Sequence, residues 1–114
     1  MSLFLILLAA GDGKRLNSKI PKPFYIVKDK TLLEHSFNAF RYSGEIKKTI
    51  IVYNKKHRKY LGKLKLNKTL KIVGGKTRQE STYKALQKIK GMGCKKVLIH
   101  DSARPFPCLL YTSP

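Results

Sequence analysis

The feature that most constrains the fold is an apolar run at residues 3–8, LFLILL, which breaks directly into AAGDGKR at residues 9–15. A continuous apolar run without polar alternation is typical of a strand buried on both faces of a parallel sheet. Glycines after such a strand let backbone amides approach an anion, and Lys14 and Arg15 could neutralise phosphate. We therefore predict a central strand that opens into a phosphate-binding loop. The alternative is an ordinary strand-to-helix turn with an exposed Lys-Arg pair.

Three further apolar segments have the same character, and we expect them to be strands at 49–53, 70–73 and 96–99. Segments with helical spacing of apolar residues alternate with them, at 31–44, 57–66 (weak and basic) and 77–89. Alternation of this kind predicts an α/β, Rossmann-like parallel sheet with helices on both faces, here with about four strands. Ligands of such sheets bind at the carboxyl ends of the strands.

Local signals refine this scheme between residues 18 and 34. Pro21 and Pro23 argue against any helix at residues 18–24 and favour extended backbone, which continues to residue 27. Asp29-Lys30 reads as a turn. Thr31 followed by Glu34 predicts a capping box at the start of the first helix.

The chain is strongly basic, with 25 Lys and Arg against 6 Asp and Glu and a net charge of +19. Such an excess favours polyanionic partners, and a basic nucleic-acid-binding module is an alternative function. The lysines are scattered, with few aromatic residues between them, so solvated surface lysines are the better explanation of the charge, and we do not expect nucleic acid as a partner. The apolar run is too short for a signal peptide or membrane span, and the two cysteines lack metal-site spacing. We expect a cytoplasmic protein without a membrane partner.

A glycine pair at Gly74-Gly75 precedes the helix expected at 77–89. It is not a Walker A loop, because Leu70 stands where that motif needs glycine. Leu16 likewise stands where the dinucleotide fingerprint needs its third glycine, which weakens an NAD site. The functional candidates here are the glycine pair with Arg78 and Ser81; the alternative is a solvated helix start.

Asp101 follows the fourth expected strand, with Arg104 three residues later. A carboxylate at this place is a plausible ligand for Mg²⁺, which favours one or two carboxylates plus phosphate oxygens. Alternatively, Asp101 pairs with Arg104 or caps the next segment. His35 and His57 have no carboxylate partner in their motifs, and we expect them to be structural or solvated.

Taken in chain order, these elements resemble 2-C-methyl-D-erythritol 4-phosphate cytidylyltransferases of the non-mevalonate isoprenoid pathway. The blocks that carry the resemblance are Leu8-Ala9-Ala10-Gly11-x-Gly13-x-Arg15, Pro21-Lys22-x-Phe24, Leu32-Leu33-Glu34-His35-Ser36, Gly74-Gly75-x-x-Arg78-x-x-Ser81 and His100-Asp101-x-Ala103-Arg104-Pro105. The first two indicate the wider nucleotidyltransferase superfamily, and the last two narrow it to cytidylyltransferases. The likeness covers about the first half of a family member.

The resemblance implies roles for individual residues. Binding of the nucleotide would fall to Ala9, Ala10, Gly11, Gly13, Lys14, Gly74, Gly75, Arg78, Ser81 and Arg104. Arg15 and Lys22 would be catalytic, and Asp101 would help to bind Mg²⁺. The implied reaction transfers a cytidylyl group from CTP to the polyol phosphate, with ribitol 5-phosphate as an alternative acceptor. A homodimer is implied for the full-length protein.

The chain departs from the family in two respects. Pro23 stands where the family usually has glutamine. The family's second half, with the acceptor site, a further metal-binding aspartate, another catalytic lysine and an exchanged arm, has no counterpart here. We therefore expect residues 1–106 to be the CTP-binding part, inactive alone, and residues 107–114 to be a tail that is not native. Whether a cyclodiphosphate synthase domain was fused stays open.

Overall fold

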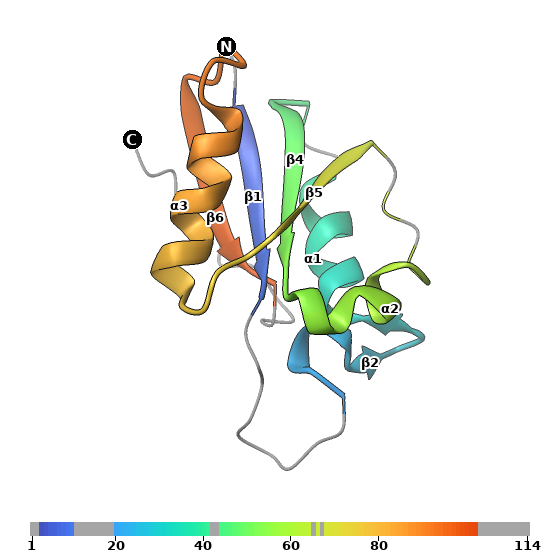
Figure 1. The fold of residues 1–114 in the computed structure, drawn as a ribbon. Helices are drawn as coiled ribbons and strands as arrows, with labels where there is room; N and C mark the ends of the chain where they lie inside the picture. Colours follow the sequence, from blue (N-terminus) through green and yellow to red (C-terminus); the bar gives the residue numbers. More distant parts are fainter. Residues whose placement is uncertain (1–2, 11–19, 42–43, 65, 67, 103–114) are drawn as a thin grey trace.

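Four parallel strands form the centre of the molecule (Figure 1). The computed structural model describes residues 3–10, 20–41, 44–64, 66 and 68–102. The strands are β1 (Leu3–Ala9), β4 (Ile46–Tyr53), β5 (Thr69–Val73) and β6 (Lys96–Asp101), in the spatial order β5-β4-β1-β6. All three neighbouring pairs are parallel. The predicted α/β sheet is confirmed, although β4 starts three residues earlier than expected, at Ile46, Lys47 and Lys48, none of which is buried.

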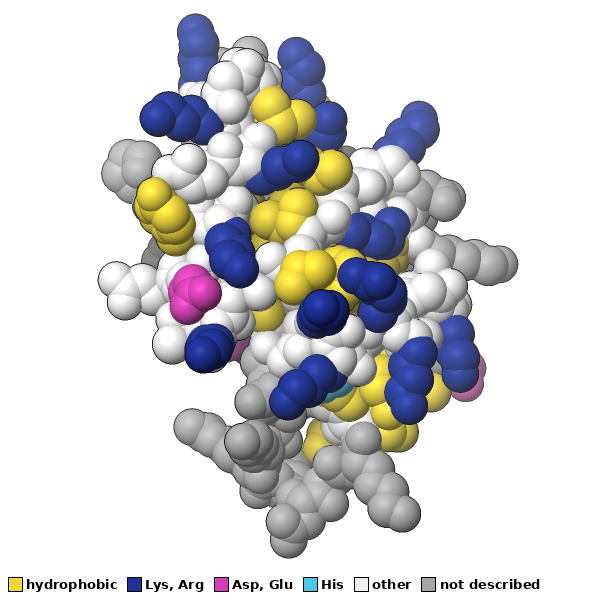
Figure 2. Space-filling view, in the orientation of Figure 1, with side chains coloured by type: hydrophobic (Ala, Val, Ile, Leu, Met, Phe, Trp, Pro, Cys, Tyr) yellow, Lys and Arg dark blue, Asp and Glu magenta, His cyan; other side chains and the backbone are white. Residues whose placement is uncertain are grey.

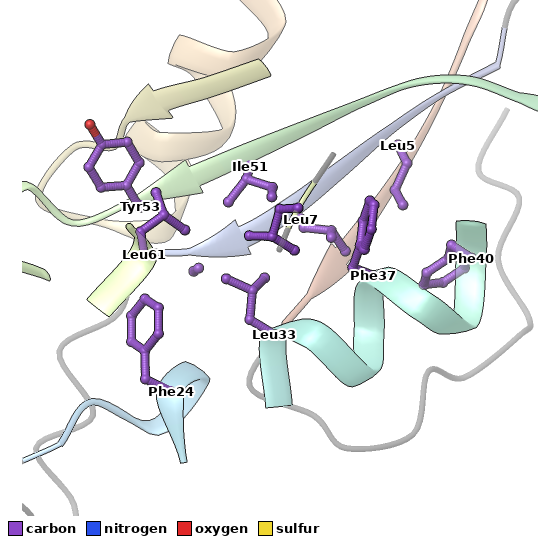
Figure 3. Close-up of a cluster of buried hydrophobic side chains, with 11 residues drawn as sticks. Leu5, Leu7, Phe24, Leu33, Phe37, Phe40, Ile51, Tyr53 and Leu61 are labelled. Carbon is purple, nitrogen blue, oxygen red and sulfur yellow. The ribbon is translucent and has the colours of Figure 1, made fainter. Parts of the chain in front are cut away.

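Strand β1 is buried on both faces, as its unbroken apolar run predicted. Leu5 and Leu7 belong to one hydrophobic cluster, whereas Phe4 and Ile6 belong to another. Because successive side chains of a strand alternate between faces, each cluster fills one side of the sheet. Figure 3 shows the first cluster, where Leu33, Phe37 and Phe40 of a helix point toward the strands.

Helices cover both faces. Helix α1 (Leu32–Arg41) and the short α2 (Arg58–Leu61) lie on the side of the first cluster. Helix α3 (Arg78–Ile89) packs on the other side, where Ala85 and Ile89 complete the second cluster. This two-sided arrangement follows from the strand order, since the β5-to-β6 connection crosses back over β4 and β1.

Hydrogen bonds at the helix starts agree with the sequence. The Thr31 amide donates to Glu34 Oε1 at 2.9 Å, and the Glu34 amide donates to Thr31 Oγ1 at 3.1 Å, so the predicted capping box is confirmed. Thr77 Oγ1 accepts from the Glu80 amide at 3.0 Å and starts α3. Gly91, with φ of +89°, follows the end of α3, in a conformation that glycine adopts readily.

Residues 57–66 were expected to be weakly helical, and the structure corrects their extent. The helical backbone begins earlier, with a 3-10 turn η3 (Lys55–His57), and α2 ends at Leu61. Asn54 Oδ1 caps the turn by accepting from the Lys56 amide at 2.9 Å. Gly62, a poor helix former, is the C-cap and donates its amide to the Arg58 carbonyl at 3.1 Å.

The extended backbone predicted around the two prolines is wrong at residues 22–24, which form a 3-10 turn, η2 (Lys22–Phe24). Proline is tolerated in the first turn of a helix because the amide that it lacks would have no partner there. Pro23 occupies such a position, with Pro21 as the N-cap. A single helical turn is therefore compatible with both prolines, although a longer helix would not be.

A β-hairpin with a two-residue loop follows, in which β2 (Ile26–Val27) pairs with β3 (Lys30–Thr31). The turn falls on Lys28 and Asp29, with φ of 52° and 72°, and not on Asp29-Lys30 as predicted. Two-residue hairpin loops favour positive φ at both central residues, which is usually signalled by Asn-Gly or Asp-Gly. That signal is absent from the sequence, so the prediction slipped by one residue.

No helix among the described residues is long and apolar enough to cross a membrane. Lys and Arg side chains are spread across the face shown in Figure 2, between hydrophobic areas, and do not gather over one element of that face. This distribution fits solvated lysines better than one continuous basic patch.

Candidate nucleotide-binding cleft

A cavity of about 630 Å³ lies at the carboxyl ends of the strands. It receives residues from the end of every strand of the sheet and from the first turns of α3. Its lining residues are Leu8, Ala10, Asn54, Lys55, Lys56, Val73, Gly74, Gly75, Lys76, Thr77, Arg78, Glu80, Ser81, Lys84 and Asp101. The position is the one expected for a ligand of a parallel sheet.

The connection from β5 to α3 approaches the end of β1 very closely at Gly74. A Cβ added to Gly74 would lie 2.6 Å from Ser81 Oγ and 2.8 Å from Ala10 Cβ. The Gly74 amide donates to the Tyr53 carbonyl at 2.7 Å, which fixes the turn to the end of β4. Only glycine fits this contact without displacing its neighbours.

Ser81 ties the glycine turn to the helix that follows it. Its hydroxyl accepts a hydrogen bond from the Gly75 amide at 3.0 Å, and the side chain is 1% exposed. We refer to Ala10, Gly74, Gly75 and Ser81 as the glycine junction. All four were predicted nucleotide-binding residues, and the fold brings them together although they come from distant parts of the sequence.

Cations surround the glycine junction. Arg78 lines the cavity as predicted, together with four lysines that the sequence reasoning did not single out: Lys55, Lys56, Lys76 and Lys84. Two carboxylates, from Glu80 and Asp101, also line it. With five cations against two carboxylates, the cavity favours an anionic ligand with several charges.

Asn54 is a further lining residue that sequence reasoning missed. Its Nδ2 lies 3.4 Å from the carbonyl oxygen of Ala10, the residue directly after β1. Its Oδ1 orients the turn that carries Lys55 and Lys56 by accepting from the Lys56 amide. The signal available in the sequence was its place, directly after an apolar strand and therefore at the ligand-binding edge.

Asp101 is the last residue of β6, half-buried, and it lines the cavity. Next to it, Ser102 donates from its amide and its hydroxyl to the Leu8 carbonyl, at 3.0 Å and 2.7 Å. These bonds hold the ends of β6 and β1 together. Within the described ranges, no group of three or more His, Cys, Asp and Glu is placed to hold a metal ion.

The remaining predicted residues fall into two groups. Ala9 ends β1, but its side chain is buried in the first cluster, and Lys22 is exposed on η2; neither lines the cavity. Gly11, Gly13, Lys14, Arg15 and Arg104 lie outside the described residues. His35 and His57 make structural contacts as expected, His35 through Nε2 to the Val27 carbonyl and His57 by ring packing on Phe24 and Tyr60.

Comparison with known proteins agrees with this geometry. The family model for 2-C-methyl-D-erythritol 4-phosphate cytidylyltransferase matches residues 3–110. The bifunctional enzyme IspD/IspF of Pelagibacter ubique is 45% identical, over 92% of this chain and 28% of its own length. The 2-C-methyl-D-erythritol 4-phosphate cytidylyltransferase of Clostridium botulinum strain Loch Maree is 40% identical, over 90% of this chain and 46% of its own length.

Comparison with solved structures finds the same family. The solved structure of the bifunctional IspDF from Campylobacter jejuni superposes with a TM-score of 0.75 at 28% identity. The superposition covers 90% of this chain and 26% of that one. Because the family model covers nearly all of the sequence, this chain belongs to the 2-C-methyl-D-erythritol 4-phosphate cytidylyltransferase family, and it spans about half the length of its single-activity curated relatives.

Proposed function

We propose that this chain is the CTP-binding part of an enzyme that transfers a cytidylyl group from CTP to 2-C-methyl-D-erythritol 4-phosphate and releases pyrophosphate. The observation that carries the proposal is the glycine junction inside a cation-lined cavity at the carboxyl ends of the strands. Backbone groups exposed beside glycine can approach a flat base closely, and the surrounding cations suit a triphosphate. Family membership supports CTP as the nucleotide and the methylerythritol phosphate as the acceptor, in preference to ribitol 5-phosphate.

The resemblance to the family supports a role for each predicted residue. Cytosine and ribose would be held by Ala9, Ala10, Gly11, Gly75 and Ser81. The remaining nucleotide contacts would come from Gly74, Arg78 and Arg104, and the triphosphate would be wrapped by Gly13, Lys14 and Arg15. The lysines around the cavity add further positive charge beside the phosphates.

In the reaction, a phosphate oxygen of the acceptor attacks the α-phosphorus of CTP in line with the leaving group. A new phosphorus–oxygen bond forms as the bond from the α-phosphorus to the bridging oxygen breaks, and pyrophosphate leaves with that electron pair. Negative charge grows on the α-phosphate oxygens, and the cations of Arg15 and Lys22 would stabilise it. A phosphate nucleophile is already ionised at neutral pH, so no general base is needed.

We also propose that the site binds a divalent cation, Mg²⁺. The half-buried carboxylate of Asp101 faces a cavity that suits a triphosphate, and Mg²⁺ characteristically binds one or two carboxylates together with phosphate oxygens. When bound, the metal would neutralise part of the phosphate charge. Asp101 itself would fix where the metal sits relative to β1 and β6.

This chain spans 46% of the length of a single-activity relative. We place the acceptor site, the second metal ligand and the dimer contacts in the remaining part of the family's length. Residues 1–106 alone would bind CTP but would not transfer the cytidylyl group. Addition of the second half should restore transfer.

The test is calorimetric titration of this chain with CTP in the presence of Mg²⁺, compared with UTP, ATP and a single-stranded RNA. We expect saturable binding of CTP that the other nucleotides do not match. Equal binding of every nucleotide, or binding of RNA that CTP does not displace, would favour a basic nucleic-acid module. A chain that includes the second half should release pyrophosphate with methylerythritol phosphate and not with ribitol 5-phosphate.

A further inference from the structure

The turn that carries Lys22 is held by aromatic side chains from another part of the chain. The Phe24 ring at the end of η2 stacks on the Tyr60 ring of α2, with centroids 5.3 Å apart and planes 26° apart. His57 of η3 meets both rings edge-on, with centroid distances of 6.2 Å to each. We call Phe24, His57 and Tyr60 the aromatic clamp.

The clamp is anchored in the core at one end. Phe24 is 3% exposed and belongs to the cluster that contains Ala9 and Tyr53, the last residues of β1 and β4. Figure 3 shows Phe24 pointing from its turn toward Leu61 of α2, on the same side as Leu33 of α1. The turn is thereby attached to the carboxyl edge of the sheet, where the cleft lies.

The backbone between Lys22 and Phe24 has little conformational freedom. The Phe24 amide donates to the Pro21 carbonyl at 2.9 Å, and the Tyr25 amide donates to the Lys22 carbonyl at 3.1 Å. Proline at positions 21 and 23 fixes φ at two further points. Whatever holds Phe24 therefore also sets the direction in which Lys22 leaves the turn.

Tyr60 is the less buried partner of the stack. Its side chain is half-buried, and Lys59 Nζ lies 5.2 Å from the centre of its ring. Since an aromatic pair adds stability beyond the area that it buries, loss of this ring would loosen the turn while the core around Phe24 remains.

From these contacts we propose that Tyr60 and Phe24 are positioning residues, which hold the turn so that Lys22 faces the phosphates of the bound nucleotide. The role of Lys22 rests on the proposed function, whereas the mechanical role of the clamp does not. Helix α2 contributes no residue to the cleft lining, but through Tyr60 it would help to position Lys22.

The variants are Tyr60→Leu, which removes the ring, Tyr60→Phe, which keeps it, and Tyr83→Leu as a control. Tyr83 is 60% exposed on α3, which covers the other face of the sheet. Amide hydrogen exchange in the absence of nucleotide measures directly how firmly the clamp holds the turn. We expect Tyr60→Leu to speed exchange of the Tyr25 amide by about three- to tenfold, with β1 amides unchanged. Tyr60→Phe and Tyr83→Leu should leave the Tyr25 amide at the wild-type rate.

The affinity for CTP measures whether loss of the clamp changes the contact of Lys22 with the nucleotide. Tyr60→Leu should weaken CTP binding by about three- to tenfold and leave cytidine, which has no phosphate, unaffected. Combined with Lys22→Ala, it should cost little more than Lys22→Ala alone, because both changes remove the same contact.

The outcomes separate the two claims. An unchanged Tyr25 amide in Tyr60→Leu would overturn the clamp, whether or not CTP binds. Fully additive losses in the double variant, or equal losses for CTP and cytidine, would overturn the link to Lys22. If the wild-type chain bound no CTP, the proposed function would fail, while the exchange data would still decide whether the clamp holds the turn.

Discussion

Two lysine-lined cavities lie at opposite edges of the sheet. The cleft at the carboxyl edge measures about 630 Å³, and a hollow near the amino ends of β4 and β5 measures about 560 Å³. The hollow is lined by Phe4, Lys47, Lys48, Lys68, Thr69, Leu70 and Met92. Both are cationic and of similar size, but only the cleft contains a glycine junction, a buried hydroxyl and carboxylates. Charge alone therefore does not distinguish the two cavities; the close backbone approach at Gly74 does.

The largest effect is expected from Gly74→Ala. The new methyl group would lie 2.6 Å from Ser81 Oγ, 2.8 Å from Ala10 Cβ and 2.9 Å from Val52 Cγ1. Overpacking of this kind costs about 1–3 kcal/mol, and the displacement falls on the glycine junction, which we propose to bind the base. We expect a lower melting temperature and CTP binding weakened by more than about tenfold. Gly44→Ala is the control, because nothing lies within 4 Å of its added Cβ; a loss of CTP binding there would contradict the account.

Ser81→Ala should have the next largest effect. It leaves the Gly75 amide without its acceptor inside the junction, at a cost of about 1–3 kcal/mol. Thermal unfolding and CTP titration should both report the loss. Thr82→Ala, one residue later on α3, removes only an exposed bond from the Thr82 hydroxyl to the Arg78 carbonyl. If the two variants behaved alike, the junction would have no special role.

Paired lysine variants compare the two cavities directly. Replacement of Lys55 and Lys56 by alanine removes two cations from the cleft, whereas replacement of Lys47 and Lys48 removes two from the hollow. Exposed charges contribute about 0.2–1 kcal/mol each, so CTP affinity should fall by about two- to thirtyfold in the first variant. The second should bind CTP as the wild type does. Equal losses would mean that the net charge, and not the cleft, attracts the nucleotide.

The smallest effect concerns Pro23, which lines neither cavity. Pro23→Gln introduces the residue that the resemblance leads us to expect here. It frees the backbone of the unfolded chain and should cost about 0.4–1 kcal/mol of stability. CTP affinity should stay within about twofold, because η2 remains attached through Phe24. Denaturant unfolding measures the first quantity and calorimetry the second. A large loss of CTP affinity would show that the proline itself positions Lys22.

Long-range architecture was predictable because it depends on strong patterns. The unbroken apolar run of β1 indicated a strand buried on both faces, and β-branched runs located its neighbours. The capping pair Thr31 and Glu34 was readable for the same reason, since spacing alone determines its bonds. The hairpin turn at Lys28 and Asp29 was misplaced, because its residues carry no glycine signal.

The candidate site was predictable where chemistry follows a motif. Gly74, Gly75, Ser81 and Asp101 were found in this way, and they do line one cleft. Asn54 was missed, although its place directly after an apolar strand was a signal. The four lysines of the cleft were also missed, because only the folded sheet brings them to one cavity. The stacking of Phe24 on Tyr60 was equally invisible, since nothing in either local sequence specifies its partner.

The central claim is that the glycine junction binds CTP. An NMR titration of the isotopically labelled chain with CTP and Mg²⁺ tests it most directly, because each backbone amide reports its own surroundings. The account predicts saturable shifts at the amides of Ala10, Gly74, Gly75 and Ser81, with Lys47, Lys48 and Lys68 unchanged. Shifts concentrated at those three lysines, or spread evenly over all lysines, would contradict it.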